Sequence, residues 1–90
     1  MIKHLKLRIT GRVQGVGFRY HTRRKAVFLG LKGFVENRPD GSVYAEIEGP
    51  SEQVDEMVQW CRTGSPMAQV GNVTIEEGPP VQYEDFEVRR

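Results

Sequence analysis

The first third of the chain alternates between apolar and polar positions and then changes period. Residues 5–10 place an aliphatic side chain at every second position, which is the pattern of a strand with one buried face. Residues 11–17 contain three glycines and predict a loop. From Phe18 to Leu29, buried-type side chains recur every three or four residues, as on one side of a helix, and Gly30 is typical of a helix end. The chain therefore begins with a strand, a glycine-rich loop and a helix.

The middle of the chain predicts a hairpin followed by a second helix. Residues 33–48 hold two alternating segments separated by the turn sequence of residues 39–41, Pro-Asp-Gly. A helix start follows at Ser51, with acidic residues near its N-terminal end, and the break at Gly64 ends that helix. These signals add two antiparallel strands and one helix.

The last segment predicts two more strands and completes the fold. Val73 and Ile75 indicate one strand, Phe86 and Val88 another, and a Gly-Pro-Pro turn at residues 78–80 separates them. The order is βαββαβ plus a fifth strand, which predicts an α+β, ferredoxin-like α/β sandwich with both helices on one face of an antiparallel sheet. The pattern does not say where the fifth strand pairs.

The composition limits the class of protein. Ninety residues with a mass of 10.3 kDa make one domain, residues 1–90, which excludes a two-domain enzyme or a Rossmann dehydrogenase. No apolar run approaches the roughly 18 residues of a membrane span, and the start of the chain lacks the apolar region of a secretory signal. Cys61 is the only cysteine, so it can form neither an intrachain disulfide nor a cysteine zinc cluster. We expect a cytoplasmic monomer with no metal and no cofactor.

The net charge of +1 hides an uneven distribution along the chain. Residues 1–35 carry nine lysines and arginines and no acid, whereas residues 36–90 carry four against twelve acids. An N-terminal part of this kind is suited to an anionic ligand. The alternative is that the acidic part of the chain simply pairs with the basic part across one fold.

The loop before the first helix has the features of a phosphate site. Its glycines allow backbone N–H groups to converge on an anion, and the helix that follows adds unpaired N–H groups and the positive end of its dipole. Arg19 adds a planar two-pronged donor. The spacing fits neither a Walker loop nor a dinucleotide fingerprint. The predicted phosphate-binding residues are Gln14, Gly15, Val16, Gly17, Phe18 and Arg19, and we expect a phosphate or sulfate ion to bind among them.

Two segments of the sequence resemble the signatures of the acylphosphatase family. Residues 11–19, GRVQGVGFR, are similar to the first signature, and residues 33–37, GFVEN, followed by Gly41, Val43 and Gly49, are similar to the second. The resemblance implies a ferredoxin-like enzyme that hydrolyses acyl phosphates without metal or cofactor. It also implies that Arg19 binds the phosphoryl group and that Asn37 holds the attacking water.

One residue departs from the family pattern. Glu36 stands where relatives more often carry Arg, Lys or Gln. Neighbouring strand residues point to opposite faces, so we expect its carboxylate to be turned away from the water at Asn37.

Several residues have simpler interpretations that the sequence leaves open. Arg19 could form a structural ion pair, and Asn37 could cap the turn at residues 39–41. His4 is predicted on a solvent-facing strand position, His21 as a partly exposed packing residue, and Cys61 as a core thiol.

Two other functions remain as alternatives. One is an anion-binding domain without catalysis. The other is an RNA-binding module of the RRM type, which has a related fold and uses aromatic side chains on its sheet to stack bases. The predicted third strand offers Tyr44 with Glu46 and Glu48 on one face, and these carboxylates would repel a phosphate backbone. We therefore expect neither nucleic acid nor membrane as a partner.

Overall fold

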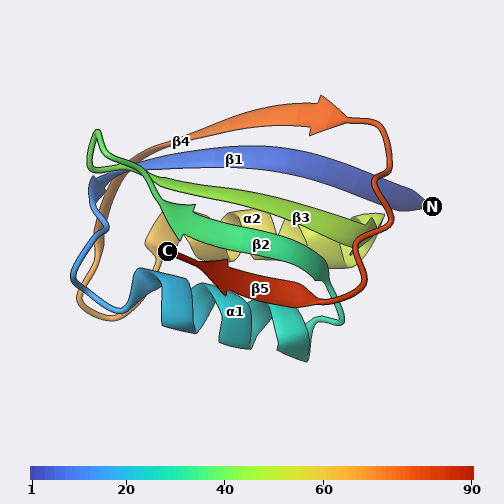
Figure 1. Ribbon diagram of the computed structural model, residues 1–90, viewed down its shortest axis with the longest axis horizontal. Helices are drawn as coiled ribbons and strands as arrows, with labels where there is room; N and C mark the ends of the chain where they lie inside the picture. The colour runs from blue at the N-terminus through green and yellow to red at the C-terminus, as the bar shows by residue number, and fades with distance from the viewer.

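The computed structural model describes residues 1–90 and contains five strands and two helices (Figure 1). In chain order these are β1 (Ile2–Arg12), α1 (Phe18–Phe28), β2 (Lys32–Asn37), β3 (Val43–Pro50), α2 (Ser51–Thr63), β4 (Gln69–Gly78) and β5 (Phe86–Arg89). This order confirms the predicted βαββαβ arrangement with a fifth strand. Neither helix has the length and apolar character that crossing a bilayer requires.

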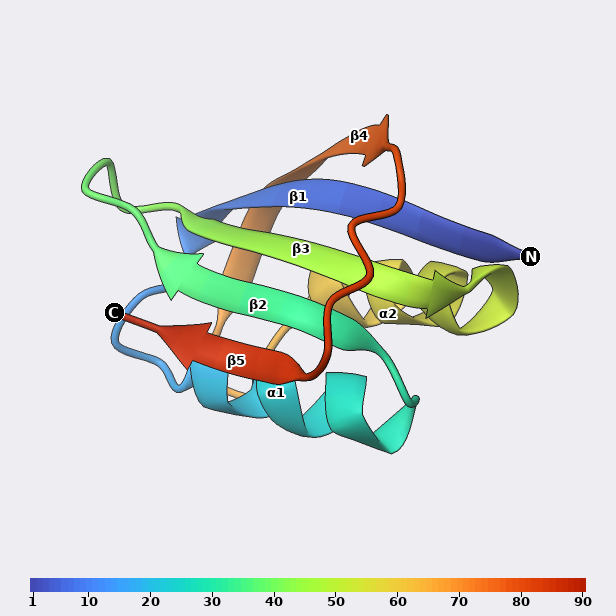
Figure 2. The ribbon, with the colours of Figure 1, turned by 45° about the vertical axis from the view of Figure 1, so that its right-hand side comes forward.

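The strands form one sheet in the order β4-β1-β3-β2-β5. The first four strands pair antiparallel with their neighbours, whereas β5 pairs parallel with β2 at the edge of the sheet. Both helices lie on the same face, with α1 packed on β2 and β5 and α2 packed on β1, β3 and β4 (Figures 1 and 2). The sequence left the pairing partner of β5 open. In the structure β5 pairs with β2 and packs against α1.

The core lies between the sheet and the two helices. The alternating side chains of residues 5–9 and 43–47 point into it, as do Phe18 and Ala26 of α1. Cys61 on α2 is fully buried in this layer, and burial raises the pKa of its thiol to about 12. The prediction of a core thiol is confirmed.

The opposite face of the sheet is not open along its whole length. Residues 79–85, here called the strap, connect β4 to β5 and cross in front of the sheet (Figure 2). His4 lies beneath the strap with only 2% of its surface exposed. The prediction that His4 faces solvent is therefore wrong, because alternation identifies the face of a strand and not what covers that face.

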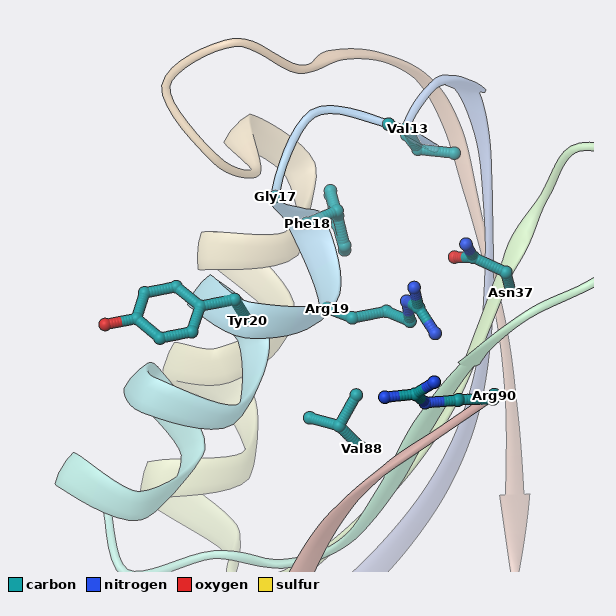
Figure 3. A pocket seen from close by; sticks show the side chains of 9 residues that line it. Val13, Gly17, Phe18, Arg19, Tyr20, Asn37, Val88 and Arg90 are labelled. Carbon is teal, nitrogen blue, oxygen red and sulfur yellow. The ribbon is translucent and has the colours of Figure 1, made fainter.

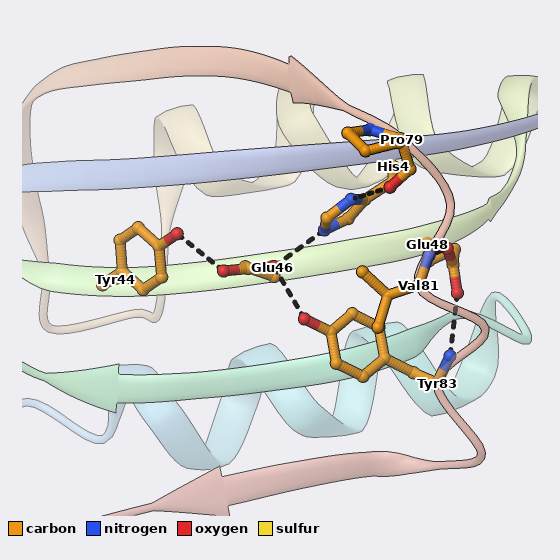
Figure 4. A network of polar contacts seen from close by, with 7 residues as sticks. All are labelled: His4, Tyr44, Glu46, Glu48, Pro79, Val81 and Tyr83. Atoms are coloured by element: carbon orange, nitrogen blue, oxygen red, sulfur yellow. Dashed lines mark hydrogen bonds and ion pairs between the residues drawn. The ribbon is translucent and has the colours of Figure 1, made fainter.

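A polar cluster fastens the strap to the sheet (Figure 4). The carboxylate of Glu48 accepts hydrogen bonds from the backbone N–H groups of Val81 and Tyr83, at 2.6 and 2.9 Å. Glu46 accepts hydrogen bonds from the hydroxyls of Tyr44 and Tyr83, each at 2.7 Å. The two ring nitrogens of His4 lie 2.8 Å from the carboxylate of Glu46 and 2.8 Å from the carbonyl oxygen of Pro79. The polar side chains on this face of the sheet therefore bind the strap, which leads into β5.

Candidate active site

The loop between β1 and α1 is shaped by two glycines in the left-handed conformation. Gly15 and Gly17 each have a φ of 74°, which side-chain-bearing residues rarely adopt. Gly17 precedes the first residue of α1, and no side chain caps the helix there. The first backbone N–H groups of α1 are therefore left without helical partners. The left-handed glycines and the uncapped helix start are the backbone features that the predicted phosphate site requires.

Hydrogen bonds from two side chains hold this loop in place, one from Gln14 of the loop itself and one from Ser65 after α2. The Gln14 amide donates hydrogen bonds to the carbonyl oxygens of Arg38 and Ser42, at 2.8 and 2.9 Å. The hydroxyl of Ser65 donates to the carbonyl oxygen of Val16 at 2.9 Å, and the Val16 side chain packs against the core. The side chains of Gln14 and Val16 are thus occupied in supporting the loop, and neither residue is among those that line the cavity described below.

Arg19 projects from the first turn of α1 and is only partly exposed. Its Nη1 donates a hydrogen bond of 3.0 Å to the carbonyl oxygen of Arg89 on β5. It forms no ion pair with any of the twelve acids, whereas Arg38 pairs with Glu36 at 2.8 Å. The interpretation of Arg19 as a structural ion-pair residue has no support in these contacts.

Asn37 ends β2 on the face that the helices cover. It stands opposite Val43 in the β2–β3 pairing, and Val43 is fully buried in the core. The neighbouring Glu36 is opposite Tyr44 on the other face, where its carboxylate meets Arg38. The expected separation between the Glu36 carboxylate and the Asn37 side chain is therefore confirmed.

The turn after Asn37 is capped by a different residue. Asp40 accepts hydrogen bonds from the backbone N–H and the hydroxyl of Ser42, at 3.0 and 2.6 Å. These bonds, together with Arg8, lower the pKa of Asp40 to about 2. Since Asp40 performs the capping, the side chain of Asn37 is free for another role.

Arg19 and Asn37 share one cavity of about 570 Å³, in which the two side chains point toward each other (Figure 3). The loop glycines at one end and β5 at the other complete its wall, and no acidic residue lines it. The lining residues are Val13, Gly15, Gly17, Phe18, Arg19, Tyr20, Asn37, Val88 and Arg90. A cavity with two arginines, free N–H groups and no aspartate or glutamate is suited to a small anion.

The other candidate residues lie outside this cavity. His21 is half-buried on α1 and lines a separate groove with Phe28 and Trp60, as a packing residue would. No three His, Cys, Asp or Glu side chains of the chain converge in a group that could hold a metal ion.

The sequence analysis missed Val88 and Arg90 as cavity residues. Both follow from the parallel pairing of β5 with β2, in which Val88 stands opposite Val35 and therefore faces the helices. Alternation then brings Arg90 to the same side. The sequence did contain a signal, because Val88 and Arg90 are two residues apart and so point to the same side of an extended chain. That signal could be used only once the position of β5 in the sheet was known.

The sheet face opposite the helices offers little to stacked bases. The guanidinium of Arg38 lies over the ring of Tyr44 at 4.2 Å, and that of Arg89 lies over the ring of Phe34 at 3.8 Å. These aromatic faces are therefore already covered by the chain's own arginines, and the RNA-binding alternative gains no support.

Comparison with known proteins gives one consistent family. A family model described as acylphosphatase matches residues 5–88. The chain is 48% identical over 86 residues to an acylphosphatase of Acaryochloris marina, covering 96% of this chain and 92% of that one. It is 52% identical over 82 residues to an acylphosphatase of Trichormus variabilis, covering 91% and 81%. A solved acylphosphatase structure from Coxiella burnetii superposes with a TM-score of 0.95 at 36% identity, covering 98% and 93%.

Proposed function

Because the chain belongs to the acylphosphatase family, whose reaction splits the carboxyl–phosphate anhydride of an acyl phosphate into a carboxylate and inorganic phosphate, we propose how its cavity performs that hydrolysis. The phosphoryl group binds between the loop of residues 14–18 and the guanidinium of Arg19. The attacking water is held by Asn37. The observation that carries the proposal is that Arg19 and Asn37, from different elements, point into the same cavity, which no aspartate or glutamate lines (Figure 3).

Binding of the phosphoryl group follows from the donors on one side of the cavity. The backbone N–H groups around Gly15 and Gly17 and the N-terminal end of α1 are fixed before substrate arrives. Arg19 is oriented by its hydrogen bond to the Arg89 carbonyl, which leaves its remaining N–H groups for phosphoryl oxygens. Such fixed donors stabilise the charge that develops on these oxygens during transfer.

The water is positioned by an amide rather than by a base. The carboxamide of Asn37 both accepts and donates hydrogen bonds, so it can orient a water for attack in line with the leaving group. It cannot take a proton near pH 7, and the water's proton passes instead to a phosphoryl oxygen of the substrate. The leaving group is a carboxylate, which needs no protonation at this pH, so no general acid is required.

Hydrolysis of benzoyl phosphate in EDTA at neutral pH tests these roles. We expect metal-free turnover by the unmodified protein and a loss of at least a hundredfold in kcat/KM for Arg19→Ala and for Asn37→Ala, since one fixed donor is worth about 100- to 1000-fold. Circular dichroism establishes that each variant is folded.

Matched substitutions outside the cavity serve as controls. Arg24 is an exposed arginine on the same helix as Arg19, and Asn72 is an exposed asparagine on β4. Arg24→Ala and Asn72→Ala are expected to keep kcat/KM within threefold of the unmodified protein. A folded Arg19→Ala or Asn37→Ala protein with the same activity as these controls would contradict the assigned roles. A folded protein with no turnover at all would favour the anion-binding domain without catalysis.

A further inference from the structure

The end of β5 brings a second guanidinium to the cavity. In the pairing of β2 with β5, Glu36 stands opposite Arg89, so the next position brings Arg90 beside Asn37. Figure 3 shows the Arg90 side chain reaching into the cavity next to Arg19, with Arg19 between it and the loop at Gly17. Arg90 therefore lies on the side of Arg19 that the loop does not occupy.

Neither of these two arginines pairs with an aspartate or glutamate side chain. On the other face of the same strands, Arg38 pairs with Glu36 and Arg89 with Glu87, at 2.8 and 3.6 Å. Arg19 and Arg90 form no such pair, and no aspartate or glutamate lines their cavity. Two neighbouring guanidinium groups repel each other unless negative charge binds between or beside them. The loop and Arg19 suffice for one phosphoryl group, which leaves Arg90 for another anionic group.

We propose that Arg90 is a specificity-determining residue that binds a second anionic group on the acyl part of the substrate, so that the preferred substrates are acyl phosphates carrying a further carboxylate or phosphate. The inference rests on the proposed function, because it places the phosphoryl group at the loop and Arg19. Val88, two residues earlier on β5, gives an apolar surface beside Arg90 along which the hydrocarbon of the acyl part can lie (Figure 3). The planar guanidinium is suited to a carboxylate or a phosphate as a two-pronged donor.

Two substrates of the same shape test this assignment. Para-carboxybenzoyl phosphate carries the second anion, and para-carbamoylbenzoyl phosphate replaces it with a neutral amide. We expect the unmodified protein to show a kcat/KM ratio of about five in favour of the carboxylate, as an arginine–carboxylate pair near solvent supplies. The ratio falls to about one in Arg90→Gln and is retained in Arg90→Lys, which keeps the positive charge.

The control removes an adjacent charge of the same kind. Arg89→Gln deletes a guanidinium one position away on β5, where the side chain lies over Phe34 on the opposite face. We expect this variant to keep the ratio, which separates direct contact from a general loss of positive charge.

The outcomes separate the two proposals. A ratio near one in the unmodified protein, with both substrates hydrolysed, overturns the role of Arg90 and leaves the proposed function intact. An Arg90→Gln variant that loses activity equally on both substrates also overturns it, because Arg90 would then act on the phosphoryl group. If the folded protein hydrolyses neither substrate, the proposed function itself fails.

Discussion

At the scale of single residues, two glycines near α1 allow backbone strain to be separated from function. Gly15 in the loop and Gly30 after the helix have φ angles of 74° and 73°, and a Cβ added to either would meet no atom within 4 Å. Alanine at either position is therefore strained without a clash, and we expect each change to lower the free energy of unfolding by about 1 kcal/mol. Only Gly15→Ala is expected to lower kcat/KM for benzoyl phosphate, by tenfold or more, because, of these two glycines, only Gly15 lies in the loop proposed to bind the phosphoryl group.

Urea unfolding and steady-state kinetics on the two variants check this expectation. Equal losses of activity in Gly15→Ala and Gly30→Ala would mean that the enzyme responds to global stability and that the loop geometry at Gly15 is not specifically required.

The pH dependence of hydrolysis is also decided by individual residues. No histidine, aspartate or glutamate lines the cavity, and His21 lies in a separate groove. An ordinary histidine titrates near pH 6.5, so a histidine acting in the reaction would produce an inflection there. We expect kcat for benzoyl phosphate to be flat from about pH 6 to 8, and His21→Gln to change it by less than threefold. An inflection that disappears in His21→Gln would contradict the proposed mechanism, because it would show that His21 carries a proton in the reaction.

At the scale of elements, the strap depends on the charge of Glu48. Burial acts to raise the pKa of this carboxyl, but hydrogen bonds from the backbone of residues 81–83 outweigh it, and the pKa in the fold is lowered. A lowered pKa contributes stability above the unfolded value of about 4.3, and this contribution is lost as the pH falls through the lower folded value. We expect Glu48→Gln to cost about 2 kcal/mol at pH 7, because a carboxamide cannot accept both N–H bonds.

Unfolding measurements at a second pH, and on a second variant, control this prediction. The difference in unfolding free energy between the unmodified protein and Glu48→Gln should be smaller at pH 3 than at pH 7, because the carboxyl loses its charge as the pH falls toward its lowered pKa. Glu77 on β4 is exposed, and Glu77→Gln is expected to change stability by less than about 0.5 kcal/mol at either pH. A Glu48→Gln difference that does not depend on pH would mean that side-chain shape and not charge holds the strap.

The elements themselves were predictable because their signals are local. Periodicity and glycine or proline breaks were sufficient for the order of strands and helices, and alternation correctly separated Glu36 from Asn37. The position of His4 was not predictable, since the strap that covers it is 75 residues away along the chain at Pro79. Local patterns determine which face a side chain takes, and tertiary contacts determine whether that face is covered.

At the scale of the whole molecule, the site is assembled from segments that are distant in sequence. The loop and Arg19 could be proposed as a phosphate site from their residue types, and Asn37 could be proposed from the family resemblance. The parallel pairing of β5 at the edge of the sheet could not be predicted from the sequence. An edge strand can pair at either side of the sheet, and only its packing against α1 determines which side it takes. For this reason the cavity residues on β5 and the acceptor of the Arg19 hydrogen bond appeared only in the structure.

A site built from three segments should be lost only when the whole fold is lost. Trp60 is the only tryptophan, and its ring lies 5.7 Å from that of Phe18, so its fluorescence reports on α2 packing beside the loop. Phe86 at the start of β5 is 5% exposed and joins the same core cluster as Phe18. We therefore expect hydrolytic activity, Trp60 fluorescence and circular dichroism to share one midpoint in urea, as a two-state domain requires. Activity lost at a lower urea concentration than fluorescence would instead show that β5 detaches first and takes the acceptor of Arg19 with it.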